Sequence, residues 1–297
     1  MEREKVLLLS LALLSVMLLI VNGCSTSKEW TIKHGATNVI DLSYPMKPGM
    51  TLLKPIYPDL EYKIMEVGGK KLVPDVDSTG YPHQGFYARF VTTGPNGLLE
   101  GYGTHVEASS HAFGVRGLNI DQYPLSAFIG PGAVINVADK AAKNPEYKTS
   151  VDDLLAWEKK YGKIPDGAVV ILNNGWGKYW GDYDAFFGVD KDKHHHYPGL
   201  SPEAAQWLVD NRKINALGMD TATIDGRPAV PVPGYPKDRM ALGLSRKITM
   251  SPPHNILHIE YLANLDELPE SGSLIICAPI NFVGGYAGVV RCLGVLP

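Results

Sequence analysis

The chain has 297 residues, of which 45% are hydrophobic and 20% charged, a balance typical of a globular protein with a sizeable core. Its formal net charge is -3, so the chain has no excess of basic residues and nucleic acid is not an expected partner. The length fits one large domain or two small ones.

The N-terminus reads as an export signal and not as part of the fold. Arg3 and Lys5 precede an apolar run over residues 6–21, which has the length of a signal-peptide core and is short for a membrane span. Cys24 follows in a sequence that resembles a lipobox, where the cysteine becomes lipid-modified. A lipoprotein, a cleaved signal and an uncleaved anchor are the alternatives, and each exports the protein. We expect a signal peptide over residues 1–23, lipidation at Cys24 and a location in the cell envelope, membrane-anchored or secreted.

Residues 24–37 are polar and predict a tether to a domain over residues 38–297. We expect this domain to open with a strand at residues 38–43, which prolines and a glycine end. Residues 51–83 are rich in Pro, Tyr and Lys and predict a long loop or excursion, whereas residues 85–92 alternate in the manner of a strand.

The next segment, residues 101–113, holds two histidines and a glutamate close together. If it is extended, His105 and Glu107 lie on the same side, because side chains alternate along a strand. An imidazole nitrogen and a carboxylate oxygen from such positions make half of a metal site. His111 follows after a short loop and is a candidate proton carrier. Surface or hydrogen-bonding histidines are the alternative, and a metal site needs further ligands from elsewhere.

The second half of the chain alternates strands and helices. Apolar runs predict strands at residues 132–138, 168–172 and 214–219. Helices are expected to begin at Ser150, which precedes an acid three residues later, and at Ser201, which precedes a proline in the first turn. This order of elements predicts an α/β fold.

Cys277 and Cys292 both lie in apolar runs that predict strands. An exported setting permits a disulfide between them. A free cysteine, however, is commonly a small buried hydrophobic residue, and this is the interpretation we favour. Two cysteines without nearby cysteine partners do not predict a zinc site.

Residues 101–111 resemble the signature of the cyclase-like family of metal-dependent hydrolases, which includes bacterial kynurenine formamidases and isatin hydrolases. The family pattern reads His-x-Gly-Thr-His-x-Asp-x-Pro-x-His, and Gly103, Thr104, His105 and His111 match it. The chain departs from it with Gly101 for the first histidine, Glu107 for the aspartate and Ser109 for the proline. Further segments that resemble the family, in the same order along the chain, extend the resemblance over residues 38–297. The resemblance implies a single compact α/β domain, with a mixed β-sheet flanked by helices.

In this family a second histidine and a glutamate complete the metal site. Glu260 matches the glutamate, but Ile248 stands where the histidine is expected. His254 is the favoured replacement, ahead of His258, and loss of this ligand is the other alternative. The resemblance thus implies a site formed by His105, Glu107, His254 and Glu260. Carboxylate and imidazole ligands suit Mn or Zn, and one or two divalent ions are expected.

The resemblance implies a metal-dependent hydrolase that cleaves a C–N amide bond, in an arylformamide or in a cyclic amide such as an isatin-like ring. The expected partner is a small-molecule amide, and His111 is expected to pass a proton to the leaving nitrogen. Aromatic side chains that could line the pocket, although each is also a candidate core residue, are Tyr102, Phe113 and Trp176.

Two other interpretations remain open. The departures at the ligand positions favour a non-catalytic exported binding protein that keeps the fold, and an unrelated envelope protein is the third alternative. The membrane, through the N-terminal anchor, is a further expected partner, and assembly into a homo-oligomer is left open. His194, His195 and His196 follow a charged stretch and are expected to lie in a solvated loop.

Overall fold

The computed structural model describes residues 38–46, 50–51, 60–64, 66–67, 70–71, 88–92, 100–226 and 243–297. The expected signal peptide, the lipidation site Cys24 and the tether lie outside these residues. Within the described ranges, no helix combines the length and the apolar character that crossing a bilayer requires.

The described residues form a large mixed sheet with strand order β1-β15-β13-β7-β9-β11-β12-β6-β14. Its strands are β1 (Val39–Asp41), β6 (His105–Glu107), β7 (Ile129–Asn136), β9 (Val169–Asn173), β11 (Ala216–Met219), β12 (Leu257–Glu260), β13 (Ser271–Ile276), β14 (Ala287–Val289) and β15 (Leu293–Val295). The central strands β7, β9, β11 and β12 are parallel, and antiparallel strands extend the sheet on both sides. This arrangement confirms the expected α/β fold with a mixed sheet.

Short strand pairs lie outside this sheet. Antiparallel pairs join β2 (Leu60–Ile64) to β5 (Ala88–Thr92) and β3 (Glu66–Val67) to β4 (Lys70–Lys71), and a parallel pair joins β8 (Lys148–Thr149) to β10 (Gly199–Leu200). Within the long loop or excursion expected over residues 51–83, the structure thus places the short strands β2, β3 and β4. Residues 60–64 alternate apolar and charged or polar side chains, which is the period of a strand, and the surrounding prolines and lysines obscured it.

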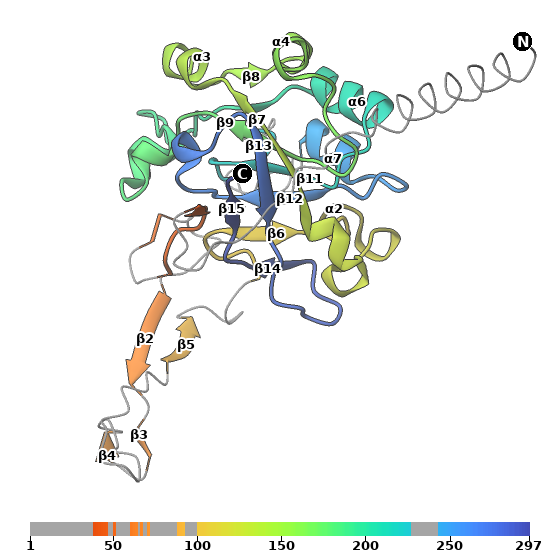
Figure 1. The fold of residues 1–297 in the computed structure, drawn as a ribbon. Helices are drawn as coiled ribbons and strands as arrows, with labels where there is room; N and C mark the ends of the chain where they lie inside the picture. Colours follow the sequence, from red (N-terminus) through yellow and green to blue (C-terminus); the bar gives the residue numbers. More distant parts are fainter. Residues whose placement is uncertain are drawn as a thin grey trace, which may run out of the picture.

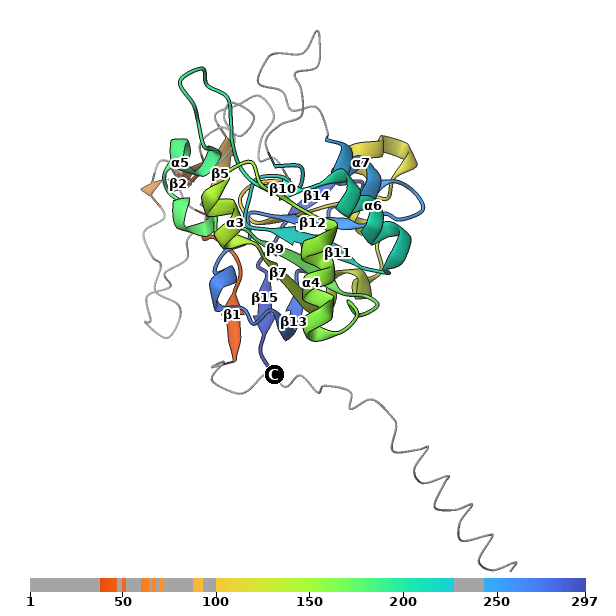
Figure 2. The same cartoon turned by 90° about the horizontal axis from the view of Figure 1, so that it is seen from above.

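Helices flank the sheet. They are α2 (Ser110–Phe113), α3 (Ala138–Lys143), α4 (Val151–Tyr161), α5 (Tyr183–Phe187), α6 (Pro202–Asn211) and α7 (Leu244–Met250). Single 3₁₀ turns occupy Gly114–Arg116, Ile120–Gln122, Leu125–Phe128, Gly177–Tyr179 and Leu265–Glu267. In Figures 1 and 2, α3, α4 and α6 lie over β7, β9 and β11.

Both predicted helix starts are confirmed. Ser150 caps α4: its side chain accepts a hydrogen bond from the Asp153 backbone N–H, and the Asp153 carboxylate accepts one from the Ser150 N–H at 2.8 Å. Ser201 caps α6 by accepting from the Ala204 N–H at 3.1 Å, with Pro202 in the first turn. These bonds, reciprocal at α4 and single at α6, satisfy backbone donors that a helix N-terminus otherwise leaves unpaired.

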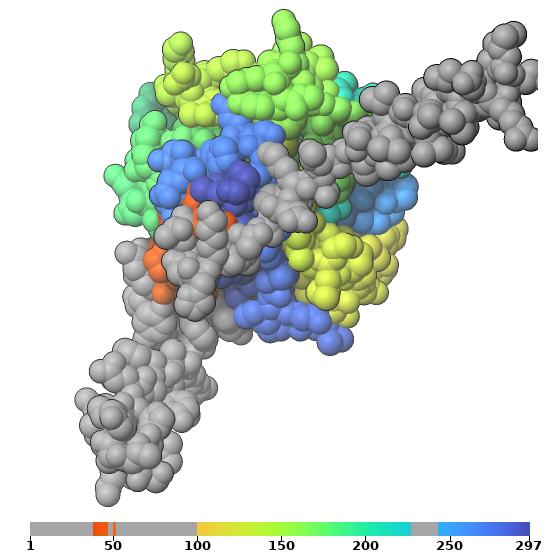
Figure 3. Space-filling view, in the orientation of Figure 1, coloured from red at the N-terminus to blue at the C-terminus, as the bar shows by residue number. Residues whose placement is uncertain are grey.

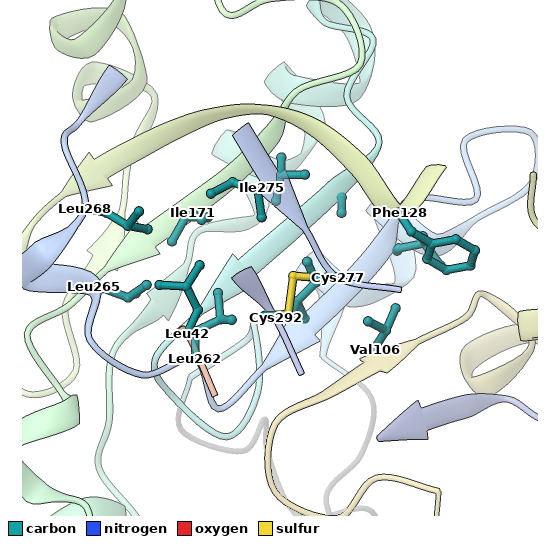
Figure 4. Packing of buried hydrophobic residues seen from close by; sticks show 14 of the residues in the cluster. Leu42, Val106, Phe128, Ile171, Leu262, Leu265, Leu268, Ile275, Cys277 and Cys292 are labelled. Atoms are coloured by element: carbon teal, nitrogen blue, oxygen red, sulfur yellow. A yellow bond between two sulfur atoms is a disulfide. The ribbon is translucent and has the colours of Figure 1, made fainter. Parts of the chain in front are cut away.

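The core consists of separate clusters on the two faces of the sheet. Leu257 and Ile259 of β12 belong to the cluster on the inner, curled face, which Figure 4 shows from close by. Leu217 and Met219 of β11 belong to the cluster beneath α4 and α6. Because side chains alternate along β12, its polar residues face the helix-covered side, where α7 also lies.

Cys277 and Cys292 form a disulfide inside the inner cluster, with their Cα atoms 4.4 Å apart (Figure 4). The preference for two free cysteines is therefore wrong. Cys277 directly follows β13 and Cys292 directly precedes β15, and these strands are antiparallel neighbours. Their pairing brings the two sulfur atoms together, and no local pattern in the sequence states which strands pair.

Candidate metal centre

Four polar side chains meet on neighbouring strands at one face of the sheet. In the antiparallel pairing of β6 with β12, His105 lies opposite Glu260 and Glu107 lies opposite His258. Opposite residues in such a pair share a face, and so do alternate residues of one strand, so all four project to the same side. None of the four is more than 3% exposed. Buried charge of this density requires compensation by hydrogen bonds or a cation.

The tautomer of His105 is set by its neighbours. Its Nδ1 lies 2.8 Å from the Gly103 carbonyl oxygen, so Nδ1 donates and Nε2 carries the lone pair. Nε2 lies 3.4 Å from Glu107 Oε1 and 3.6 Å from Glu260 Oε2. Gly103 has a φ of 61°, a left-handed conformation that favours glycine where the chain presents this carbonyl. The imidazole lone pair therefore faces two carboxylate oxygens.

This donor set fits one divalent ion. Ligands about 2.1 Å from a tetrahedral ion lie roughly 3.4 Å apart, which matches the separations around His105 Nε2. Ligand atoms of His105, Glu107 and Glu260 all lie within 4.8 Å of one another. Three electron-rich atoms that face one another in a buried site repel unless a proton or a cation lies between them. The structure thus brings together three of the four ligands predicted from the sequence.

Arg246, which the sequence analysis missed, binds both glutamates from α7. Its Nη1 donates to Glu107 Oε2 at 2.6 Å, and its Nη2 donates to Glu260 Oε1. Nη1 also lies 3.2 Å from His111 Nδ1. Arg246 thus takes one oxygen of each glutamate, and the other oxygen of each remains directed toward His105.

Helix α7 carries Arg246 on its buried side. Arg246, Thr249 and Met250 are all buried, and they stand at the spacing of one helix face, whereas Lys247 is exposed. Thr249 Oγ1 lies 2.8 Å from His258 Nε2 and so ties α7 to β12. The buried side of α7 also carries Ser245 and Thr249, so no apolar stripe in the sequence marked Arg246 as a buried residue.

His111 stands at the open edge of the cluster. Its side chain is 32% exposed, against 4% or less for Glu107, Glu260 and Arg246. Nδ1 lies 2.9 Å from Glu107 Oε1, and the ring packs against Tyr286 at a centroid distance of 4.6 Å. The carboxylate orients Nδ1, which leaves Nε2 for proton exchange at the accessible side.

The pKa values reflect a local excess of negative charge. Burial alone would raise the pKa of Glu107, but Arg246 and His111 hold it well below its usual range. Burial, together with the charge of Glu107, raises the pKa of Glu260 to about 8. Burial would lower the pKa of His105, but the contact with Glu107 and the charge of Glu260 outweigh it and raise that pKa. The cluster therefore holds one more carboxylate than Arg246 neutralises.

His254 does not join the cluster, so its expected role as a ligand does not agree with the structure. Helix α7 ends at Met250, and the turn that follows contains Pro252 and Pro253 and leaves His254 exposed. His258 does lie on the correct face. Its Nε2 contacts Thr249, and in the described part of the chain its buried Nδ1 has no hydrogen-bond partner. Burial, then the charge of Arg246, lowers the pKa of His258 to about 3, so its ring is neutral.

The proposed aromatic pocket is also revised. Tyr102 is fully buried beside Met50, and Trp176 is buried in an aromatic cluster with its Nε1 donating to the Phe186 carbonyl at 2.7 Å. Both are core residues, the alternative that the sequence left open. Phe113 is half-buried at the end of α2, the helix that carries His111.

A second group with metal-type side chains, Asp190, Asp192 and His194, lies in the solvated loop expected around His194. The carboxylate of Asp190 accepts hydrogen bonds from the backbone N–H groups of Asp192 and His194, at 2.9 and 2.8 Å. These bonds close a turn, and Asp192 and His194 are exposed. The arrangement is explained by the loop itself.

Comparison with known proteins identifies the family. A family model described as Putative cyclase matches residues 40–226, more than half of the chain. The chain belongs to the cyclase family. The matched residues of this cyclase-family protein include His105, Glu107 and His111, whereas Arg246 and Glu260 lie beyond the match.

Individual relatives agree with this assignment. The cyclase-family chain is 28% identical over 209 residues to an isatin hydrolase of Roseibium aggregatum, across 67% of this chain and 73% of that protein. It is similar to the structure of isatin hydrolase A from Ralstonia solanacearum, with 27% identity, a TM-score of 0.68 and coverage of 87% and 92%. A structure described as a potential metal-dependent hydrolase with cyclase activity shares the fold at 18% identity, with a TM-score of 0.54 and coverage of 86% and 96%.

Proposed function

We propose that this protein is a metal-dependent hydrolase that opens a cyclic amide, with isatin-like rings as the substrate class. The observation that carries the proposal is the buried triad of His105, Glu107 and Glu260, whose ligand atoms converge at the spacing of a metal site. The similarity to isatin hydrolases supports the substrate class, because it extends over most of both chains. Hydrolysis of an arylformamide is the less favoured specificity.

His105 Nε2, Glu107 Oε1 and Glu260 Oε2 would hold the ion, with Mn or Zn as candidates. When bound, a divalent ion polarises a carbonyl oxygen and makes water a stronger acid at neutral pH. The protein contributes the orientation of the ligands: the Gly103 carbonyl fixes the ring of His105, and Arg246 fixes one oxygen of each glutamate.

His111 would carry the proton between water and the leaving ring nitrogen. The Glu107 carboxylate holds its Nδ1. The His111 side chain is partly exposed, so solvent and substrate reach the cluster at this residue. Tyr286 packs against the same imidazole and places an aromatic ring at this edge, where a planar bicyclic substrate would approach.

The proposal is tested by assaying protein that has been stripped with EDTA and reloaded with Mn²⁺ or Zn²⁺. We expect isatin to be converted to the ring-opened acid, heavier by one water, only after reloading. An N-formyl arylamine serves as the competing substrate and should turn over more slowly. No ring opening by the reloaded protein, in the presence of demonstrated metal binding, would contradict the assignment of substrate class.

One observation favours a second candidate, a non-catalytic binding protein. Arg246 already provides a positive charge between the two glutamates, so a proton on Glu260 could complete the charge balance without metal. This alternative predicts that the stripped and the reloaded protein have the same melting temperature and that neither turns over any amide in a broad panel.

A further inference from the structure

The guanidinium of Arg246 occupies a position surrounded by atoms that ordinarily bind metal ions. It donates to Glu107 Oε2 and Glu260 Oε1, two carboxylate oxygens of the kind that bind metal ions, and its Nη1 also lies 3.2 Å from the His111 ring. A second donor set, formed by the other oxygens of the same glutamates and His105 Nε2, lies beside it. The two glutamates therefore face two cation positions, and an amino-acid side chain fills one of them.

We propose that Arg246 is a built-in cation that restricts this centre to a single metal ion. The inference rests on the proposed function, because it assumes that the triad of His105, Glu107 and Glu260 binds an ion. It adds that the adjacent position is closed to a second ion, since that ion would need the oxygens that Arg246 already holds.

Arginine suits this role for geometric reasons. Its planar fork donates from two nitrogens at once, so one side chain can bridge two carboxylates, and its charge persists when it is buried. The backbone N–H of Arg246 donates to Asp225 Oδ1 at 3.1 Å, and its Nε lies 3.9 Å from Asp225 Oδ2. The residue is therefore anchored at both its backbone and its side chain, which opposes displacement by a metal ion.

The same contacts make Arg246 a positioning residue for the remaining ion. Because Glu107 Oε2 and Glu260 Oε1 are each bound to the guanidinium, the rotation of both carboxyl groups is fixed. Their other oxygens are then held toward His105 before any ion arrives. Arg246 thus excludes one ion and prepares the site for the other.

The test measures bound manganese in the mature protein, for wild type, Arg246→Met, Arg246→Gln and Arg246→Lys. Each is stripped, reloaded with excess Mn²⁺, desalted and analysed for metal per chain, and its Mn²⁺ electron paramagnetic resonance spectrum is recorded. Arg246→Gln removes the charge but can still hydrogen-bond one carboxylate, so it serves if Arg246→Met does not fold. Arg212→Met is the matched control, because Arg212 makes a two-nitrogen contact with Glu158 away from this centre.

We expect one manganese per chain in wild type, in Arg246→Lys and in the Arg212 control, with the spectrum of an isolated ion. Arg246→Met or Arg246→Gln should bind twice as much and show the spin coupling of two neighbouring ions. The melting temperature of the stripped Arg246→Met protein should fall, since two buried carboxylates lose their partner, and metal should restore it.

The possible failures are distinguishable. Two ions in wild type, or one ion in both neutral variants, would overturn the role of Arg246 and leave the proposed function standing. No ion in wild type together with one in Arg246→Met would show that Arg246 replaces the metal altogether, and it would overturn the proposed function too. The absence of metal from every variant would likewise refute both.

Discussion

His111→Ala is expected to lower kcat for isatin by about 100- to 10,000-fold, the usual contribution of a positioned general acid or base. The physical reason is its place at the accessible edge of the centre, with Nδ1 held by Glu107 and the other side of the ring free to exchange a proton. Bound metal should stay unchanged, because His105, Glu107 and Glu260 remain. Steady-state kinetics with parallel metal analysis measure both quantities.

The matched control for this variant is His194→Ala, which removes a histidine from an exposed loop. It should leave both kcat and metal content unchanged. Turnover by His111→Ala at the wild-type rate would refute the proton-transfer role and leave the fold and the metal centre in place. A loss of metal from His111→Ala would instead make His111 a ligand.

Replacing a ligand of the triad is expected to remove the stabilisation that metal provides. An ion that binds only the folded state at about 100 times its Kd stabilises that state by about 2.7 kcal/mol. For a domain of this size, such a gain raises the melting temperature by roughly 5–10 °C. We expect this rise in wild type and not in Glu260→Gln or His105→Ala, as measured by thermal unfolding with and without Mn²⁺.

Asp190→Asn provides the control for these variants, because Asp190 belongs to the second cluster of metal-type side chains. It should keep the full rise in melting temperature. If Glu260→Gln and His105→Ala keep the rise and Asp190→Asn loses it, the ion binds in the loop around His194 and the assignment of the buried centre is wrong.

The part of the centre carried by one short strand could be predicted from the sequence. His105 and Glu107 are two residues apart, and the period of a strand places them on one side whatever the rest of the chain does. Glu260 was identified through the family resemblance. Its position opposite His105 depends on the pairing of β12 with β6, which only the structure shows.

Arg246 could not be found by the same reasoning, because no spacing rule relates it to β6. Its role follows from the packing of α7 on the sheet, which buries Arg246 together with Ser245, Thr249 and Met250. His254, the expected histidine ligand, lies in the turn after α7 and is exposed. The sequence showed which residues were chemically suitable, whereas the contact across the fold determined which of them meet.

In the fold, too, local features could be predicted from the sequence, whereas contacts between distant segments could not. Cap residues predicted the starts of α4 and α6 because a cap acts over three or four neighbouring residues. The disulfide depends on the neighbouring positions of β13 and β15 in the sheet. Likewise, the yellow segment that contains α2 and the turns after it lies against the blue C-terminal part of the chain in Figure 3. There the Ile120 N–H donates to the Gly285 carbonyl at 2.8 Å. Contacts between such distant segments leave no local mark in the sequence.

The most direct test of the central claim is anomalous X-ray diffraction from a crystal of the protein grown with Mn²⁺. We predict a single anomalous peak among His105 Nε2, Glu107 Oε1 and Glu260 Oε2, with Arg246 still bound to the other oxygen of each glutamate. An absence of anomalous density at this position in that crystal, or a peak only at Asp190 and His194, would contradict it.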